Sequence, residues 1–137
     1  MRGIYVLIIQ LSENVDLTIG RLGSLSFPEG FYAYVGSAQC GLEKRIERHF
    51  RKEKRVFWHV DYLLQSPHSR IVKVFYKDAE KRAECDIATK IAAEGEVVTG
   101  FGCSDCNCRS HLLRTSDLGF LSESMQEFKV SKFSAPS

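Results

Sequence analysis

The stretch that decides the fold is IYVLIIQL at residues 4–11. It is rich in Ile, Leu and Val, which predicts a buried strand. Two further strands are predicted, FYAYVGS at residues 31–37 and IVKVFY at residues 71–76. Their aromatic and β-branched side chains suit a pleated, half-buried surface. We therefore expect a small sheet that includes these three strands.

The segment between the first two strands contains turn signals. Glu13-Asn14 marks a turn, and residues 15–19 are predicted to form a short return strand. Residues 20–30 hold three glycines and one proline, which indicates turns around at most a short strand. Residues 14–30 are thus predicted to contain turns and short strands.

A helix is expected to follow, from about residue 41 to residue 52. Helical spacing places five of its residues on one inward-facing arc, namely Leu42, Arg45, Ile46, His49 and Phe50. Two of these five, Arg45 and His49, are polar. The basic residues expected to point away from the core are Lys44, Arg48 and Arg51.

Two more helices are predicted. Residues 56–65, VFWHVDYLLQ, form a shorter one that ends before Ser66-Pro67. Residues 79–94 form the other, capped by Asp78 and stopped by Gly95. One face of that helix carries Glu84, Ile87, Ala88 and Ile91.

This order of elements predicts an α+β fold. We expect a small, mainly antiparallel sheet flanked by helices, in the order β-β-α-α-β-α with an inserted hairpin. Residues 1–115 form one domain, with a Cys-rich loop at 100–111 and a short last strand at 111–114. Residues 116–137 are expected to be a C-terminal extension with a disordered end.

Composition is that of an ordinary globular protein. The 137 residues are 44% hydrophobic and 26% charged, which suits one domain and excludes collagen-like, low-complexity and coiled-coil classes. No run approaches the length of a membrane span, and no secretory signal stands at the start. We expect a cytoplasmic protein without membrane contact.

Positive charge is concentrated in one region. The net charge is +2, yet residues 43–55 hold seven lysines and arginines against three glutamates. Such a concentration attracts phosphate groups, and it equally suits a solvated helix face. As a nucleic-acid interface it would comprise Lys44, Arg48, Arg51, Lys52, Lys54 and Arg55.

Five residues from two predicted strands and two predicted helices carry side chains suited to phosphodiester chemistry. Two strands each hold a tyrosine near a glycine, in Gly3-Ile4-Tyr5 and in Tyr34-Val35-Gly36, and a tyrosine hydroxyl can donate, accept or, when activated, take a proton. Arg45 and His49 share an inward helix face. Glu84 lies on an apolar face, where a carboxylate needs a cation, a metal or hydrogen bonds. Taken singly, these residues also have structural explanations. The tyrosines suit ordinary strand aromatics, Arg45 suits an arginine that covers the core, and Glu84 suits an acid in a first helical turn.

The motifs GIY at 3–5, YVG at 34–36 and GLEKRIERHF at 41–50 resemble the GIY-YIG nuclease superfamily. The string YVGSA, followed by EKR and RHF, is especially similar to its homing endonucleases. The chain also resembles a small archaeal and bacterial subgroup, some of whose members are fused to a glycosylase of the endonuclease III type. That likeness covers about residues 1 to 115 and extends through WHVDYLL, AECDIA and GFGCSDCNCRSHL.

The resemblance implies a role for each matching residue. Tyr5 matches the tyrosine proposed as general base for the attacking water, and Tyr34 matches the one that helps arrange that water and the phosphate. Arg45 matches a helix arginine that stabilises charge on the phosphate, since its planar fork suits phosphate geometry. His49 and His59 match accessory histidines that orient a tyrosine or help proton transfer.

The resemblance also implies a cofactor and a reaction. Glu84 matches the single acidic ligand of one Mg²⁺ or Mn²⁺ ion. The reaction would be hydrolysis of phosphodiester bonds in nucleic acid, with DNA favoured, in repair or structure processing, and with a DNA glycosylase or another repair protein as a possible partner. The chain departs from the superfamily pattern in the long interval 6–33 and at Ser37, where many members carry lysine.

Four possible zinc ligands lie close together in the sequence, namely Cys103, Cys106, Cys108 and His111. Such ligands could close a tetrahedral zinc site, but a Cys-x-Cys pair seldom holds one zinc without more distant partners. A structural loop packed against the sheet is favoured over zinc. A role in the active site or in substrate recognition is the third hypothesis.

Two alternatives to a nuclease stay open. A nucleic-acid-binding module with the same fold and little activity would need only the basic 44–55 face, and its binding would depend steeply on salt. A small zinc-dependent interaction domain centred on the Cys-rich loop would contain zinc after purification. Only the nuclease would depend on Glu84 and a divalent ion.

Overall fold

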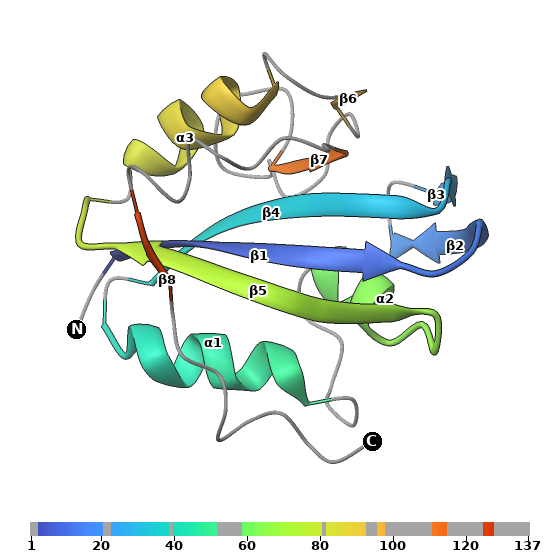
Figure 1. Cartoon of the computed structure of the whole chain (residues 1–137), viewed down its shortest axis with the longest axis horizontal. Helices are drawn as coiled ribbons and strands as arrows, with labels where there is room; N and C mark the ends of the chain where they lie inside the picture. Colours follow the sequence, from blue (N-terminus) through green and yellow to red (C-terminus); the bar gives the residue numbers. More distant parts are fainter. Residues whose placement is uncertain are drawn as a thin grey trace.

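The structure is a computed structural model that describes residues 3–20, 23–38, 40–51, 59–80, 82–92, 96–97, 111–114 and 125–127. Its centre is a six-stranded sheet in the order β6-β7-β4-β1-β5-β8, and every pair in it is antiparallel (Figure 1). The long strands are β1 (Gly3–Leu11), β4 (Gly30–Ala38) and β5 (Ser69–Lys77). The short ones are β6 (Glu96–Val97), β7 (Leu112–Arg114) and β8 (Gln126–Glu127). The predicted α+β fold with a mainly antiparallel sheet is confirmed.

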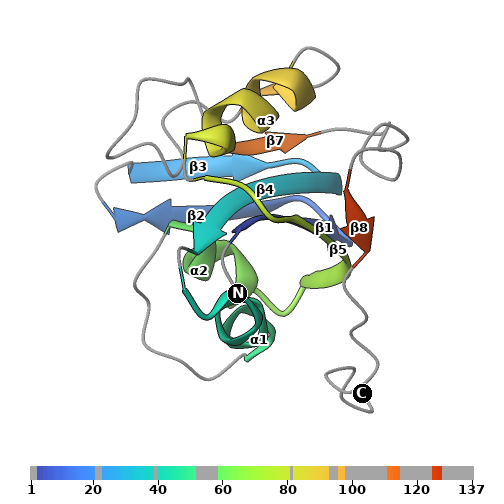
Figure 2. The same cartoon turned by 90° about the vertical axis from the view of Figure 1, so that its left-hand side faces the viewer.

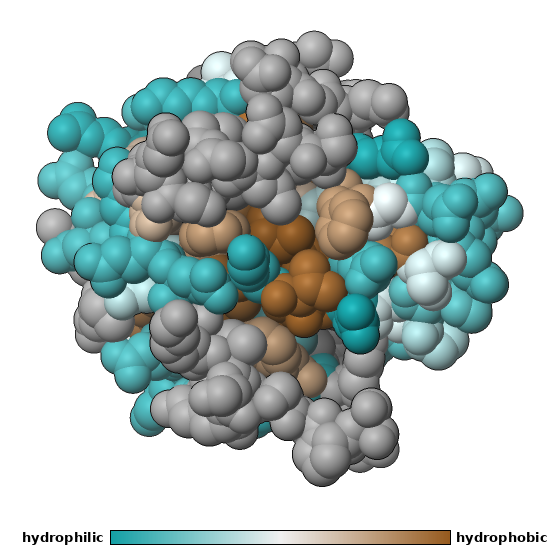
Figure 3. Space-filling view, viewed as in Figure 1, coloured by the Kyte–Doolittle hydropathy of each residue, from teal (hydrophilic) through white to brown (hydrophobic). Residues whose placement is uncertain are grey.

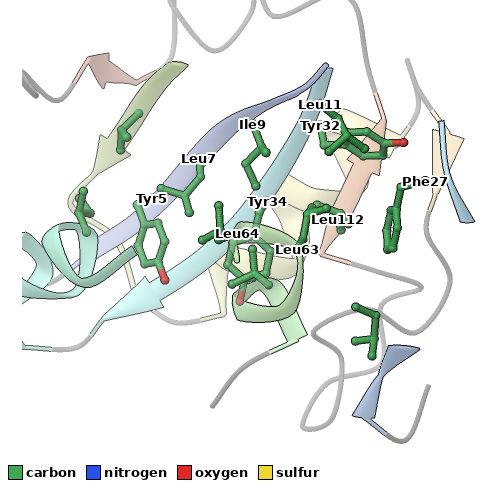
Figure 4. Close-up of a cluster of buried hydrophobic side chains, with 14 of the residues drawn as sticks. Tyr5, Leu7, Ile9, Leu11, Phe27, Tyr32, Tyr34, Leu63, Leu64 and Leu112 are labelled. Atoms are coloured by element: carbon green, nitrogen blue, oxygen red, sulfur yellow. The ribbon is translucent and has the colours of Figure 1, made fainter. Parts of the chain in front are cut away.

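Helices cover both faces of this sheet. α1 (Leu42–Phe50) and α2 (His59–Leu64) lie on one face, and α3 (Ala83–Ala92) lies on the other (Figures 1 and 2). Side chains of β1 therefore enter two separate cores in alternation. Tyr5 and Leu7 belong to the core under α1 and α2 (Figure 4), whereas Ile4 and Val6 pack with α3. This two-sided burial explains why residues 4–11 are almost continuously apolar.

The predicted inserted hairpin is confirmed. β2 (Val15–Ile19) and β3 (Gly23–Phe27) form a two-stranded sheet of their own, apart from the main one. Val15, Leu17 and Leu25 pack against the core on the α1 and α2 side, whereas the serines and Asp16 between them are exposed. This period-two alternation turns the apolar face of the hairpin toward the core.

The third helix begins later than predicted. α3 starts at Ala83, not at residue 79, because a tight turn with a 3.0 Å hydrogen bond from the Ala83 N–H to the Glu80 carbonyl precedes it. Asp78 lies outside the helix and does not cap it. The predicted apolar face is correct, since Ile87, Ala88 and Ile91 are buried against the sheet.

The chain beyond residue 115 returns to the main sheet. β8 pairs with β5 through Phe75–Glu127 and Tyr76–Gln126, and Met125 before it is buried in the core with α3. The sequence did not indicate this strand. Several predictions lie outside the described residues, namely the start of the second helix at 56–58, the stop signal of the third helix at Gly95, the loop at 100–110 and the tail at 129–137.

Figure 3 shows one face of the molecule, with an apolar area near its centre and hydrophilic side chains to the left and right of it. Among the described residues, Phe31 is the one large hydrophobic side chain that is exposed, at 41%. None of the helices in the described part of the chain is both long and apolar enough to span a membrane.

Candidate active site

Tyr5 and Tyr34 lie on neighbouring strands and on the same face of the sheet, under α1 and α2 (Figure 4). Tyr5 is opposite Gly36 in the β1–β4 pair, and Tyr34 is opposite Leu7. A Cβ added at Gly36 would lie 2.5 Å from the Tyr5 ring and hydroxyl. The glycine of YVG therefore has a steric function, because it leaves room for the tyrosine of GIY.

His49 joins the two tyrosines from α1. Its Nε2 is 2.7 Å from the Tyr5 hydroxyl oxygen, and its ring meets the Tyr34 ring edge-on at a centroid distance of 6.1 Å. All three side chains are buried. The sequence pattern had predicted that His49 faces inward, and the structure confirms it. Tyr5 and His49 can thus exchange a proton along a direct hydrogen bond.

Burial dominates the acid–base properties of both tyrosines. Loss of solvation raises the pKa of Tyr5 well above its ordinary value of about 10, while the positive charge of Arg45 and its hydrogen bond oppose that rise. Burial also raises the pKa of Tyr34, and the neighbouring charge of Tyr5 adds to the effect. Both hydroxyls therefore stay protonated at neutral pH.

Arg45 extends from the same inward side of α1, one turn before His49. Its Nη1 donates a 3.1 Å hydrogen bond to the Ser37 carbonyl, near the end of β4. The residue is partly buried. Arg45 is thus held at the sheet end where β1 begins and β4 ends.

Glu84 reaches the same sheet end from the opposite face. The Ser37 hydroxyl donates a 2.8 Å hydrogen bond to Glu84 Oε2, and His111 Nδ1 lies 2.8 Å from Glu84 Oε1. Only 13% of the Glu84 side chain and 2% of the His111 side chain are exposed. Ser37 therefore links the two faces of the sheet, because its carbonyl accepts a hydrogen bond from Arg45 and its hydroxyl donates one to Glu84.

Arg48 differs from the prediction. We expected it to point away from the core, but both of its terminal nitrogens donate 3.1 Å hydrogen bonds to the Asp61 carboxylate on α2. Asp61 is fully buried, and Arg48 is 25% exposed. The expectation failed because a buried carboxylate on the neighbouring helix needs a cation, and that helix cannot be placed from the sequence of α1.

The remaining predicted residues lie on α1 or just after it, at the start of α2, or outside the described part of the chain. Lys44 and Arg51 are exposed on α1 and after it, as predicted. His59 begins α2, and burial lowers its pKa. Outside the described residues lie Lys52, Lys54, Arg55, Cys103, Cys106 and Cys108.

The donor groups fit a hard divalent cation with few protein ligands. Among the described residues, no group of three or more His, Cys, Asp and Glu side chains could hold a metal ion. Glu84 nevertheless presents a partly exposed carboxylate, held in place by Ser37. Mg²⁺ and Mn²⁺ bind to one or two protein groups and complete their shell with water and substrate phosphate.

Sequence reasoning missed three members of the cluster. Ser37 was noticed only because many similar proteins carry lysine there, and Asp61 only as part of a motif. His111 was assigned to the Cys-rich loop, but it contacts Glu84. The one signal that could have found Asp61 is its place on the apolar side of α2, beside Val60 and Leu64.

The fold and the site define an α+β domain with a Tyr–His–Arg–Glu cluster at one end of an antiparallel sheet. The chain belongs to the family described as Domain of unknown function DUF123, which matches residues 4–133. No significant match was found among curated proteins or among solved structures. Because the family carries no assigned activity, function has to be argued from the site.

Proposed function

We propose that this domain is a metal-dependent endonuclease of the GIY-YIG type, which hydrolyses phosphodiester bonds in nucleic acid, with DNA as the favoured substrate. One observation carries this proposal. Three groups suited to phosphate chemistry meet at one sheet end, because Arg45 and Glu84 both bind Ser37 and because the charge of Arg45 acts on Tyr5.

Each group has a task in the proposed reaction. The Arg45 guanidinium is a planar, permanently charged donor that suits a phosphate oxygen. Its interaction with the phosphate becomes stronger as negative charge develops in the transition state. The Tyr5 hydroxyl and His49 Nε2 form a buried pair that moves a proton to or from the reacting water. Glu84 would hold Mg²⁺ or Mn²⁺, which when bound stabilises negative charge on the phosphate and the leaving oxygen.

The biological setting is part of the same proposal. A role in DNA repair and a glycosylase or other repair protein as partner follow from the resemblance to glycosylase-fused relatives. A cytoplasmic location is proposed because the sequence shows no secretory signal and no membrane span. A small domain offers few side chains that can read bases, so selectivity would come from the shape of the substrate or from that partner.

A second candidate is a nucleic-acid-binding module with little or no turnover. It is favoured by the burial of the tyrosines, since only 2% of Tyr5 and 7% of Tyr34 is exposed. Their raised pKa values keep both hydroxyls protonated at neutral pH, which opposes a role as base. In this module the exposed Lys44 and Arg51 would bind phosphates without any need for Glu84.

A cleavage assay separates the two candidates. The full chain is incubated with supercoiled plasmid and with branched or abasic duplexes, in Mg²⁺ or Mn²⁺ and in EDTA. The nuclease predicts cleavage that EDTA abolishes and that Glu84→Gln and Tyr5→Phe lower by about 100-fold or more. Matched controls are Asp86→Asn, an exposed acid on the same helix, and Tyr76→Phe, which loses a hydroxyl bonded to Gln126.

The outcomes differ clearly. Cleavage that survives EDTA or Glu84→Gln contradicts the nuclease. Binding without cleavage, unchanged by Glu84→Gln and weakened by Lys44→Ala or Arg51→Ala, supports the binding module. In that case each lost phosphate contact lowers the slope of log affinity against log salt by about one.

A further inference from the structure

We propose that Glu84 and His111 together form the protein part of a divalent-metal site, so that the ion of this domain is one that accepts a nitrogen ligand, such as Mn²⁺, in preference to Mg²⁺. This inference rests on the proposed function, which assigns the ion to Glu84. It adds a second ligand and a class of metal.

The separation of the two donor atoms fits a shared ion. Glu84 Oε1 and His111 Nδ1 are 2.8 Å apart. Metal–oxygen and metal–nitrogen bonds of about 2.1 Å at a right angle place their donor atoms about 3 Å apart. The 2.8 Å separation is that of an ion pair, and it also matches two adjacent positions of one ion.

The surroundings hold both donors in place. The Ser37 hydroxyl binds the other carboxylate oxygen, Oε2, and so orients Oε1 toward His111. The His111 carbonyl accepts a 2.9 Å hydrogen bond from the Val35 N–H, which fixes His111 beside β4. Groups that orient metal ligands in this way are typical of metal sites.

Access and charge also suit a phosphate-bound ion. His111 is almost fully buried, whereas 13% of Glu84 is exposed, so solvent reaches the pair from the Glu84 side. Arg45 donates a hydrogen bond to the carbonyl of Ser37, whose hydroxyl binds Glu84. Ser37 therefore places the guanidinium and the proposed ion at the same end of the sheet. An imidazole ligand favours transition metals over Mg²⁺, which prefers oxygen.

Electron paramagnetic resonance of Mn²⁺ added to the full chain tests this inference without any need for activity. We expect the free Mn²⁺ signal to decrease on binding, and electron spin-echo modulation of bound Mn²⁺ to show a ¹⁴N coupling from the imidazole. His111→Asn keeps a polar group near the Nδ1 position but removes the ring nitrogen. It should abolish that coupling and weaken Mn²⁺ binding by about tenfold or more.

Controls separate this inference from the proposed function. Glu84→Gln should weaken Mn²⁺ binding, and Asp86→Asn should not. Bound Mn²⁺ without ¹⁴N coupling, or unchanged binding in His111→Asn, overturns the role of His111 and leaves the nuclease intact. Specific Mn²⁺ binding with the coupling, but without cleavage of any DNA, supports the metal site and contradicts the nuclease. A wild-type spectrum without the ¹⁴N coupling overturns the role of His111 even if a variant fails to fold.

Discussion

Gly36 lies directly opposite Tyr5 in the β1–β4 pair, and the tyrosine ring covers the glycine backbone. The two short motifs of the sequence are therefore parts of one contact, in which the ring of the first occupies the space left by the second. This contact also fixes the direction of the Tyr5 hydroxyl, which meets His49 at 2.7 Å.

Gly36→Ala should displace the Tyr5 ring, since the new Cβ would lie 2.5 Å from it. We expect a loss of about 1–3 kcal/mol in the free energy of unfolding, as for other overpacked cores. Urea unfolding measures this loss. The same change in a Tyr5→Leu background should cost much less, and an equal cost in both backgrounds would rule out the ring contact as the cause.

Tyr5→Phe should remove the buried hydrogen bond to His49 without changing the ring packing. The expected cost is about 1–2 kcal/mol of stability, because the histidine loses a buried partner. A double-mutant cycle with His49→Leu measures the coupling, expected at about 0.5–3 kcal/mol. Tyr76→Phe, whose hydroxyl bond to Gln126 is exposed, should change stability by less than about 0.5 kcal/mol. A coupling of zero would contradict the bond.

Stability should fall at alkaline pH. Burial raises the pKa of Tyr5 and of Tyr34 in the folded chain, whereas both have an ordinary pKa of about 10 when unfolded. The folded state then binds more protons than the unfolded state above about pH 10, so the stabilisation is complete below that pH and is lost as pH rises toward the folded pKa values.

Denaturation midpoints between pH 8 and pH 11 measure this effect. Tyr5→Phe should lose stability less steeply as pH rises. Absorbance at 295 nm, which reports tyrosine ionisation, should show that the buried tyrosines stay protonated until the chain unfolds. A flat profile up to pH 11 would contradict the raised pKa values.

Arg48→Ala should destabilise the fold by about 3–5 kcal/mol, because it leaves the fully buried carboxylate of Asp61 without this cation. Asp61→Ala should cost less, since Arg48 is 25% exposed and can be hydrated. The exposed Glu80–Arg82 pair is the matched control, and Glu80→Ala should cost less than about 1 kcal/mol. Similar costs for Arg48→Ala and Glu80→Ala would show that Asp61 is not held as a buried ion.

Local patterns were enough to predict most elements. Continuous apolar character predicted β1, alternation predicted β5, and glycine and proline predicted the inserted hairpin. Boundaries were less certain, as at α3, where a turn at Glu80 delays the helix. β8 was missed because a two-residue strand has no periodicity, and only its pairing with β5 defines it.

By itself, the sequence determined the period and the apolar face of the longer elements, since side-chain spacing and solvation act locally. It thereby placed Tyr5 in a strand and His49 on the inner side of a helix. The tertiary structure alone decided which distant groups meet. Ser37 binds Glu84, His111 lies against Glu84, and Arg48 turns inward to Asp61. These contacts depend on how strands pair and how helices pack, and no local pattern records the partner that a buried polar group will find.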